Sequence, residues 1–407
     1  MRHMNAPNET TGLPECLHIA MVTETYPPEI NGVAITIRRM VRGLCARGHD
    51  IHMVRPRQHR DDKAVNADAY RETLVRGMPI PGYSGLKSGL PARGLLLRLW
   101  QEQRPDVVHI VTEGPLGWSA LSSARQLNIP VSTDFHTNFH SYTQHYGIGL
   151  LQWPIAAYLR HFHNKAACTL VPTLELKLQL ESENYRNVAV VSRGVDTALF
   201  HPSRRSDALR ASWGADDATL VVILVSRIAA EKNLALAIET FEQMRVANPA
   251  ARMVLVGDGP ARAGLQKRYP EVIFAGMKTG EELAEHYASG DVFIYPSQTE
   301  TYGNVTVEAM ASGLATIAYD YAAARQHIVH NINGVLVPLG DADAFMLQAK
   351  LLISNKERIR RLRFAAREAV KSLTWDHIMC QMEAVLLKTV RAQKDQHVQP
   401  ELATATD

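Results

Sequence analysis

Short runs of apolar residues alternate along this chain with segments whose apolar positions recur at helical spacing. In the first half, the pattern predicts strands over 17–22, 51–54, 106–111 and 130–132, and a helix over 33–47 that ends at Gly48. In the second half, it predicts strands over 220–225, 252–256, 272–274 and 291–295, and a helix over 233–245. Each half therefore predicts a Rossmann-like, doubly wound α/β domain with a parallel sheet.

The length of the chain also favours two domains, because 407 residues exceed what one hydrophobic core usually serves. A polar, charged stretch beginning at His201 separates the two halves and is expected to be the interdomain connection with a short helix. The predicted boundaries are a polar extension over 1–16, an N-terminal domain over 17–200, a C-terminal domain over 201–374 and a disordered tail over 391–407.

Composition excludes several classes of protein. With 46% hydrophobic and 21% charged residues the chain is an ordinary globular protein. Its net charge of +3 permits anionic ligands or lipid surfaces but is too mild to indicate nucleic-acid binding. The cysteines, Cys16, Cys45, Cys168 and Cys380, form no CxxC pair, which fits a reducing compartment. The polar N-terminus lacks the apolar core of a signal peptide, so we expect a cytoplasmic location.

The segment 297–313, SQTETYGNVTVEAMASG, carries the clearest chemistry. It follows a predicted strand and opens a helix near Gly303. The free amides of Gly303, Asn304 and Val305, together with the helix dipole, favour an anion such as a diphosphate. Glu308 lies among apolar residues and needs a hydrogen-bonding partner, for which a ribose diol is suitable. Glu300 precedes the helix and is expected to accept hydrogen bonds from sugar hydroxyls.

These two glutamates have the Glu-x7-Glu spacing of the retaining family-4 glycosyltransferases, which adopt the GT-B fold. Three further segments resemble the same family: VSRIAAEKN at 225–233, TDFHTNFHSY at 133–142 and SRGVDTALFHP at 192–202. The resemblance covers roughly residues 17–390 with its motifs in the family's order. It implies two domains facing a central cleft, and a last helix over 375–390 that crosses back onto the N-terminal domain.

The resemblance also assigns roles to single residues. It implies that Arg227 and Lys232 neutralise a diphosphate leaving group, which removes the need for a metal. It places Gly32 near the phosphates and His136 near the transferred sugar. Met277, in the segment FAGMK, matches the loop that holds the nucleotide base.

The implied activity is transfer of a hexose from a nucleoside-diphosphate sugar, UDP-sugar or GDP-mannose, to a hydroxyl acceptor with retention. The motifs are most similar to those of sulfoquinovosyl and mannosyl transferases that act on lipids. We therefore expect a lipid acceptor such as diacylglycerol and a peripheral contact with the inner face of the plasma membrane. Two stretches, 87–104 around Trp100 and 150–165, combine basic residues with Leu and Trp, as interfacial helices and helices that cover a sheet both do.

Other interpretations stay open at this stage. The acceptor could be a polysaccharide, and a nucleotide-sugar hydrolase or epimerase would use the same pocket, as would a non-catalytic nucleotide-sugar-binding protein. His136, His140 and His145 suggest a metal, but no carboxylate or cysteine completes a known ligand pattern, so no metal site is predicted. GDGPARAG at 257–264 has Arg262 where a dinucleotide fingerprint needs its third glycine, so a strand-to-helix turn is predicted.

Overall fold

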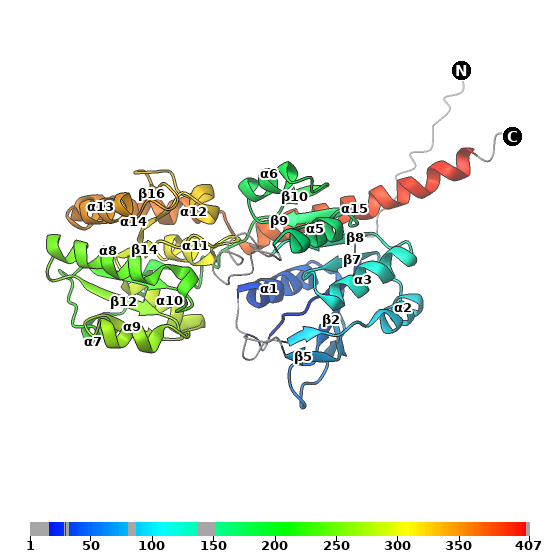
Figure 1. Cartoon of the computed structure of the whole chain (residues 1–407), viewed down its shortest axis with the longest axis horizontal. Helices are drawn as coiled ribbons and strands as arrows, with labels where there is room; N and C mark the ends of the chain where they lie inside the picture. The colour runs from blue at the N-terminus through cyan, green and yellow to red at the C-terminus, as the bar shows by residue number, and fades with distance from the viewer. Residues whose placement is uncertain (1–15, 28, 30–31, 80–86, 137–151, 404–407) are drawn as a thin grey trace, which may run out of the picture.

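The computed structural model describes residues 16–27, 29, 32–79, 87–136 and 152–403, with side chains to residue 395. Within them, the chain forms two α/β domains placed end to end, joined by a linking segment and by the last helix (Figure 1). This confirms the predicted fold class of two Rossmann-like domains with parallel sheets.

The N-terminal domain is built on a sheet of eight described strands in the order β10-β9-β8-β7-β1-β2-β4-β3. Its strands are β1 (His18–Val22), β2 (Asp50–Pro56), β3 (Asn66–Ala67), β4 (Tyr70–Val75), β7 (Val107–Ile110), β8 (Val131–Asp134), β9 (Cys168–Val171) and β10 (Val188–Val190). Its helices are α1 (Gly32–Ala46), α2 (Arg93–Glu102), α3 (Pro115–Gln126), α5 (Gln152–His163) and α6 (Leu174–Ser182). A separate hairpin pairs β5 (Gly77–Pro79) with β6 (Lys87–Gly89).

This sheet departs from the prediction at one edge. All its described pairs are parallel except the pair between β3 and β4, which is antiparallel. The sequence of β4, YRETLV, is polar because it contributes Glu72 to a buried ion pair with Arg55, whose guanidinium lies 2.8 Å from the carboxylate. A strand that buries a paired charge does not read as an apolar run, so the pattern missed it.

The C-terminal domain has a sheet of six described parallel strands in the order β13-β12-β11-β14-β15-β16. They are β11 (Val221–Val225), β12 (Arg252–Val256), β13 (Ile273–Gly276), β14 (Val292–Tyr295), β15 (Ala315–Tyr319) and β16 (Val335–Val337). The α-helices are α7 (Asp207–Ser212), α8 (Leu234–Ala247), α9 (Arg262–Arg268), α10 (Gly280–Ser289), α11 (Asn304–Ala311), α12 (Ala322–His327), α13 (Ala342–Ile353) and α14 (Lys356–Val370). Single 3-10 turns lie at Pro202–Arg204 and Ala230–Lys232.

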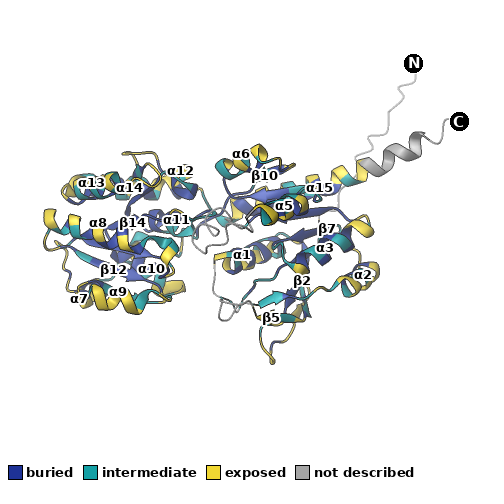
Figure 2. Cartoon of the chain, in the orientation of Figure 1, coloured by how far each residue is buried: buried dark blue, intermediate teal, exposed yellow. Residues whose placement is uncertain are grey.

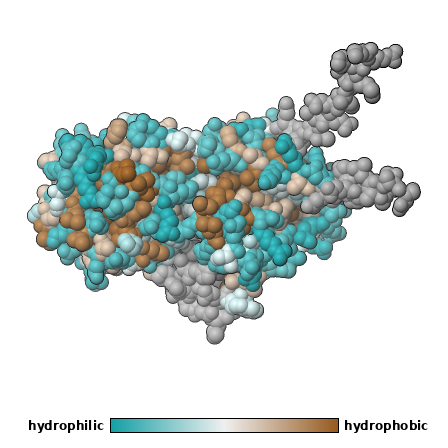
Figure 3. All heavy atoms as spheres, turned by 90° about the horizontal axis from the view of Figure 1, so that it is seen from above, coloured by the Kyte–Doolittle hydropathy of each residue, from teal (hydrophilic) through white to brown (hydrophobic). Residues whose placement is uncertain are grey.

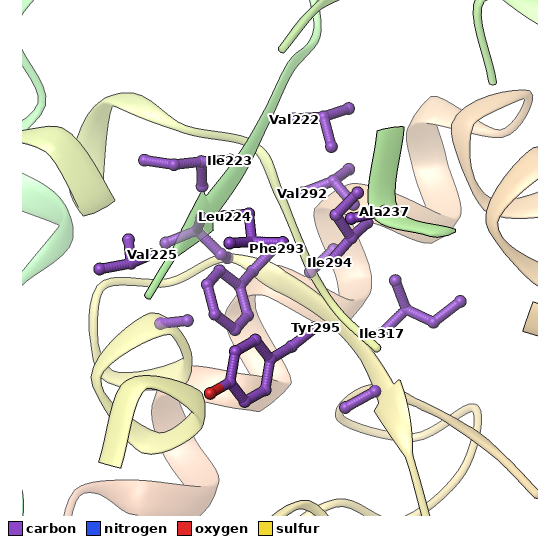
Figure 4. Close-up of a cluster of buried hydrophobic side chains, with 14 of the residues drawn as sticks. Val222, Ile223, Leu224, Val225, Ala237, Val292, Phe293, Ile294, Tyr295 and Ile317 are labelled. Atoms are coloured by element: carbon purple, nitrogen blue, oxygen red, sulfur yellow. The ribbon is translucent and has the colours of Figure 1, made fainter. Parts of the chain in front are cut away.

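Strands β11 and β14 lie at the centre of this domain and are buried on both faces. Val222, Ile223 and Leu224 contact side chains of β14 and of the flanking helices, as Figure 4 shows. Figure 2 shows the same distribution throughout, with buried strands and helices exposed on their outer faces. Burial on both faces explains why these strands are continuous apolar runs in the sequence.

The last helix, α15 (Trp375–Ala403), leaves the C-terminal domain and packs along α1 of the N-terminal domain (Figure 1). Met379, Met382 and Leu386 enter the N-terminal core beside Ile37 and Met40. The helix does not stop near residue 390. It continues through 391–403, which the sequence pattern predicts to be a disordered tail. Apart from Pro400, that stretch consists mostly of Ala, Gln, Lys, Arg, Glu and Leu, which favour helix, and it contains no glycine.

The predicted membrane contact of residues 87–104 is wrong for its central residue, Trp100. Trp100 of α2 is 1% exposed and packs with Leu96 in the N-terminal core, so it is unavailable to a lipid surface. In the second stretch, Phe162 is buried, whereas Trp153 is 77% exposed. No helix among the described residues has the length and apolarity that crossing a membrane requires.

Candidate functional site

Glu300 lies just after β14, at the carboxyl edge of the C-terminal sheet, and its Oε1 receives three donors. The Tyr295 hydroxyl donates from 2.6 Å and the Ser297 hydroxyl from 2.7 Å, while the Lys232 ammonium forms an ion pair with the same oxygen. Burial alone would raise the pKa of Glu300, but Lys232 and the two hydroxyls lower it. The carboxylate is therefore ionised at neutral pH and held in one orientation.

Lys232 reaches Glu300 because β11 and β14 are neighbours in the sheet, so the loops that follow them lie side by side. A second contact joins these loops: the Thr299 hydroxyl donates to the Glu231 carbonyl over 3.1 Å. Glu231 forms an ion pair with Arg227, whose side chain is exposed. The structure thus brings the cationic segment 227–232 against the segment that leads into α11.

The start of α11 has the backbone geometry of an anion site. Gly303, at the N-cap position, has φ of +88°, a conformation that favours glycine, and no side chain of the described residues caps the helix. Asn304 and Val305 occupy its first turn, where amides point away from the helix. The position combines the positive end of a helix dipole with the ammonium of Lys232 nearby.

Glu308, one turn further along α11, accepts a hydrogen bond of 3.0 Å from the Tyr287 hydroxyl. Burial raises its pKa to about 7, against the smaller lowering effects of that hydroxyl and of Arg39. Further hydrogen-bond donors, such as those of a ligand, would therefore stabilise the ionised carboxylate in this buried position.

In the N-terminal domain, His136 follows β8 and is held by two buried side chains. Its Nε2 lies 3.1 Å from Asp134 Oδ2, and its Nδ1 lies 3.3 Å from Arg193 Nη2. Burial alone would raise the pKa of Asp134, but the rings of His109 and His136 hold it well below its usual value. Arg193 can only donate, so Nδ1 is the acceptor and Nε2 carries the proton that Asp134 accepts. The two contacts fix the orientation of the ring from both sides.

His136 and the segment around Glu300 meet at the junction of the two domains. The Thr301 hydroxyl donates to the His136 carbonyl over 2.9 Å. The next residue, Tyr302, places its hydroxyl 3.1 Å from the Arg193 carbonyl and 2.9 Å from His327 Nε2. Residues predicted separately in the two halves of the sequence, His136 and Glu300, are therefore connected through one residue of the 300–303 segment.

Two further predicted residues, Gly32 and Met277, make no described contact with Glu300 or His136. Gly32 begins α1 after the central strand β1, and a β-carbon built on it would meet nothing within 4 Å, so that its backbone is open to a ligand. Met277 is exposed on the loop after β13. Two strands, β12 and β11, separate β13 from β14, so Met277 lies at the far side of the same sheet edge from Glu300.

The described residues hold no group of His, Cys, Asp and Glu that could bind a metal ion. Of the three histidines considered for a metal, His136 is committed to Asp134 and Arg193, whereas His140 and His145 lie outside the described residues.

Sequence reasoning missed the residues that hold the predicted ones in place: Tyr295, Ser297, Asp134, Arg193 and Tyr302. Each lies inside or beside one of the segments 133–142, 192–202 and 297–313 or the strand before it, so adjacency to a motif is the available signal. Their partners were not available from sequence, because Arg193 contacts His136 across 57 residues of chain.

Two family models match consecutive parts of the chain. Residues 30–199 match the model of Glycosyltransferase Family 4, and residues 205–369 match that of Glycosyl transferases group 1. The boundary between the matches coincides with the linking segment between the two sheets.

Curated relatives match over nearly the whole chain. A GDP-mannose-dependent alpha-mannosyltransferase of Mycobacterium tuberculosis is 32% identical over 375 residues, which cover 91% of this chain and 97% of the relative. A protein of the same description from Corynebacterium glutamicum is 31% identical, with 90% and 87% covered. A sulfoquinovosyl transferase of Arabidopsis thaliana is 28% identical, with 88% and 71% covered.

Solved structures share the arrangement of both domains. A sucrose-phosphate synthase of Thermosynechococcus elongatus superposes with a TM-score of 0.76 at 19% identity and covers 92% of this chain and 100% of its own. The HepE protein of Anabaena, in complex with UDP and glucose, superposes with a TM-score of 0.69 at 18% identity, with 91% and 99% covered. At these identities the likeness concerns the fold.

Proposed function

Because the chain belongs to the family-4 glycosyltransferases of the GT-B fold, we propose that it transfers a hexose from a nucleoside-diphosphate sugar to a hydroxyl group with retention of configuration. The observation that carries this proposal is the meeting of Glu300, Lys232 and the start of α11 with His136 of the other domain. A donor bound at the α11 end would have its diphosphate on one side of the junction and its sugar facing the other.

The reaction needs stabilisation of the departing diphosphate more than it needs a nucleophile. The bond from the sugar C1 to the β-phosphate oxygen breaks, a bond from C1 to the acceptor oxygen forms, and the acceptor proton passes to the departing phosphate. Lys232, Arg227 and the amides of Gly303, Asn304 and Val305 would bind the charge that grows on that phosphate. Since two cations are supplied by the chain itself, we propose that no metal is required.

Glu300 and Glu308 would orient the two ends of the donor. Glu300, ionised and held by three donors on Oε1, would accept hydrogen bonds from sugar hydroxyls. Glu308, with its single described hydroxyl partner Tyr287, would accept from a ribose diol. His136 would border the sugar from the N-terminal domain, and Gly32 and Met277 would border the phosphates and the base.

We propose GDP-mannose as the first donor to test and a lipid, such as diacylglycerol, as the acceptor class. The mannosyltransferase relatives are named as GDP-mannose-dependent, and relatives at 28–29% identity include alpha-monoglucosyldiacylglycerol synthases of Streptococcus pneumoniae and Acholeplasma laidlawii. UDP-sugars stay in the comparison, because a ribose is common to both donor classes. The enzyme would then work at the cytoplasmic face of the plasma membrane.

The test is a screen of GDP-mannose and UDP-hexoses against diacylglycerol, phosphatidylinositol and a soluble oligosaccharide, with product anomers assigned by NMR. The proposal expects an α-linked glycolipid that forms in the presence of EDTA. A β-linked product would overturn retention, and transfer to the oligosaccharide alone would overturn the lipid acceptor. Consumption of donor without any acceptor would show a hydrolase or epimerase, and tight nucleotide binding without turnover would show a binding protein.

A further inference from the structure

Helix α6 carries leucine on two opposite sides. Its sequence, LELKLQLES, places leucines at 174, 176, 178 and 180, and residues two apart are separated by about 200° around a helix. Leu176 and Leu180 therefore pack inward, in the cluster around Phe135 and Val171. Leu174 and Leu178 point outward and are 59% and 58% exposed.

The neighbouring helix α5 repeats this arrangement. Ile155 and Leu159 pack into the same inner cluster as the inward leucines of α6. Trp153, two positions before Ile155, points to the opposite side and is 77% exposed. Trp153, Leu174 and Leu178 are thus large apolar side chains exposed on the outer sides of two helices that share one inner cluster, and we call them the apolar surface. Exposed large apolar residues that gather on one face commonly mark an interaction site.

A basic group borders this surface at the other end of the two helices. It consists of Arg125, Arg160, Lys165 and Arg186. Arg125 and Arg160 donate to the carbonyls of Lys165 and Glu183, at 3.0 and 3.4 Å, so their described hydrogen bonds use backbone oxygens and leave their charges for another partner. The Glu183 carboxylate lies on the same turn, so the group carries a net positive charge.

The acidic residues of α6 itself form ion pairs. At its start Glu175 pairs with Arg325 of α12, which also pairs with Asp320, and in its last turn Glu181 lies 3.7 Å from Lys177. Leu174 and Leu178 are thus exposed among ion-paired side chains, whereas the side chains of the basic group form no ion pair within the part of the chain that the structure describes.

The apolar end lies beside the candidate functional site. The contact of Glu175 with Arg325, and that of its Oε2 with the Ala322 amide at 3.3 Å, hold the start of α6 against the C-terminal domain. The ends of α5 and α6 are joined at the opposite side, where Asn164 donates to the Asn184 carbonyl over 2.9 Å. Figure 3, which views this side, shows a hydrophobic patch where α6 lies in Figure 1.

We infer that the outer faces of α5 and α6 are the surface through which this protein docks on an anionic lipid bilayer. Trp153, Leu174 and Leu178 enter the interface between headgroups and acyl chains, and the basic group binds the headgroups. This inference rests on the proposed lipid acceptor, because docking there sets the junction of the domains beside the membrane.

The experiment is co-sedimentation of the full chain with vesicles of phosphatidylcholine, with and without phosphatidylglycerol. Leu174→Ser with Leu178→Ser is expected to lower the partition coefficient about 100-fold. Arg125→Gln with Arg186→Gln is expected to lower it about 10-fold on the anionic vesicles only, with a weaker salt dependence. Phe364→Ser, on α14 of the other domain, removes another exposed apolar side chain and should change nothing.

Unchanged vesicle binding by the Leu174→Ser, Leu178→Ser variant would overturn the inference. So would a wild-type dimer, seen by light scattering, that this variant converts to a monomer with its vesicle binding intact. Transfer to monomeric dihexanoylglycerol separates this question from the proposed function. If the wild type glycosylates that acceptor but does not bind vesicles, the docking surface falls and the function stands. If it binds vesicles through Leu174 and Leu178 but glycosylates no lipid, the surface stands and the acceptor class falls.

Discussion

The carboxylate of Asp134 lies 3.1 Å from Nε2 of His136, with Arg193 on the other side of the ring. Asp134 is itself buried and ionised, so it acts on the chemistry only through His136. This makes it a positioning residue of the proposed reaction.

Replacing Asp134 by Asn is expected to lower kcat about 100-fold, because the amide can donate its NH2 to Nε2 where the carboxylate could only accept, so that the ring proton can move to Nδ1, facing Arg193. KM for the donor should change little, since the side chains proposed to bind the diphosphate and the ribose, Arg227, Lys232 and Glu308, lie in the other domain. Steady-state kinetics measure the split, and histidine ring NMR reports the tautomer. Asp217→Asn, at an exposed position, is the control. A variant with normal kcat would show that the orientation of His136 is irrelevant to turnover.

Lys232→Ala is expected to reduce kcat/KM by 10²- to 10³-fold, because it removes a cation from the departing diphosphate. It also leaves Glu300 without its ion-pair partner, so the pKa of Glu300 should rise. Kinetics with GDP-mannose over a range of pH measure both effects, and Lys267→Ala on the exposed side of α9 is the matched control. If Lys232→Ala and Lys267→Ala were equally active, the segment 227–232 would have no part in donor binding.

The central strands of both domains could be predicted because β1 and β7 of the first sheet and β11 and β14 of the second are buried and appear in the sequence as apolar runs. The edge strand β4 and the burial of Trp100 could not be predicted. The buried, paired Glu72 interrupts the apolar pattern of β4, so the strand is not recognised from its sequence. The sequence around Trp100 is compatible both with a helix that faces the core and with one that faces a membrane, and the structure buries Trp100 in the core. Side-chain burial is decided by which element lies opposite, and sequence periodicity does not identify that element.

The candidate site could likewise be predicted only in part. Glu300, Lys232 and the start of α11 could be predicted, since loops after neighbouring parallel strands meet at one sheet edge. The contacts of Thr301 with the His136 carbonyl and of Tyr302 with Arg193 could not, because they depend on how the two domains approach each other. The motifs identify the charged residues of the site. The hydroxyls that orient them belong to Tyr and Ser residues, which occur throughout the chain, so their role could not be recognised from the sequence.

The crossing of α15 over α1 should depend on the absence of a side chain at Gly43. A β-carbon built there would lie 2.4 Å from Cγ of Met379, which is buried. Gly43→Leu is therefore expected to destabilise the protein by about 1–3 kcal/mol, and Met379→Ala in the same chain should recover part of that loss. Denaturant unfolding of the two single variants and the double variant measures the coupling. Simple additivity would mean that the helices do not meet at this pair.

Glu308 should make both stability and nucleotide binding depend on pH. Burial raises its pKa to about 7 in the folded protein, above the value near 4.5 of the unfolded chain. The folded state thus binds more protons between these values, so the contribution of Glu308 to stability falls as pH rises through 7. A ribose diol donates to the ionised carboxylate, so GDP affinity should instead rise over that range. Glu308→Gln should flatten both profiles, measured by thermal unfolding and by calorimetric titration between pH 5.5 and 8.5. A GDP affinity that stays equally pH-dependent in this variant would exclude Glu308 as the group that binds the ribose.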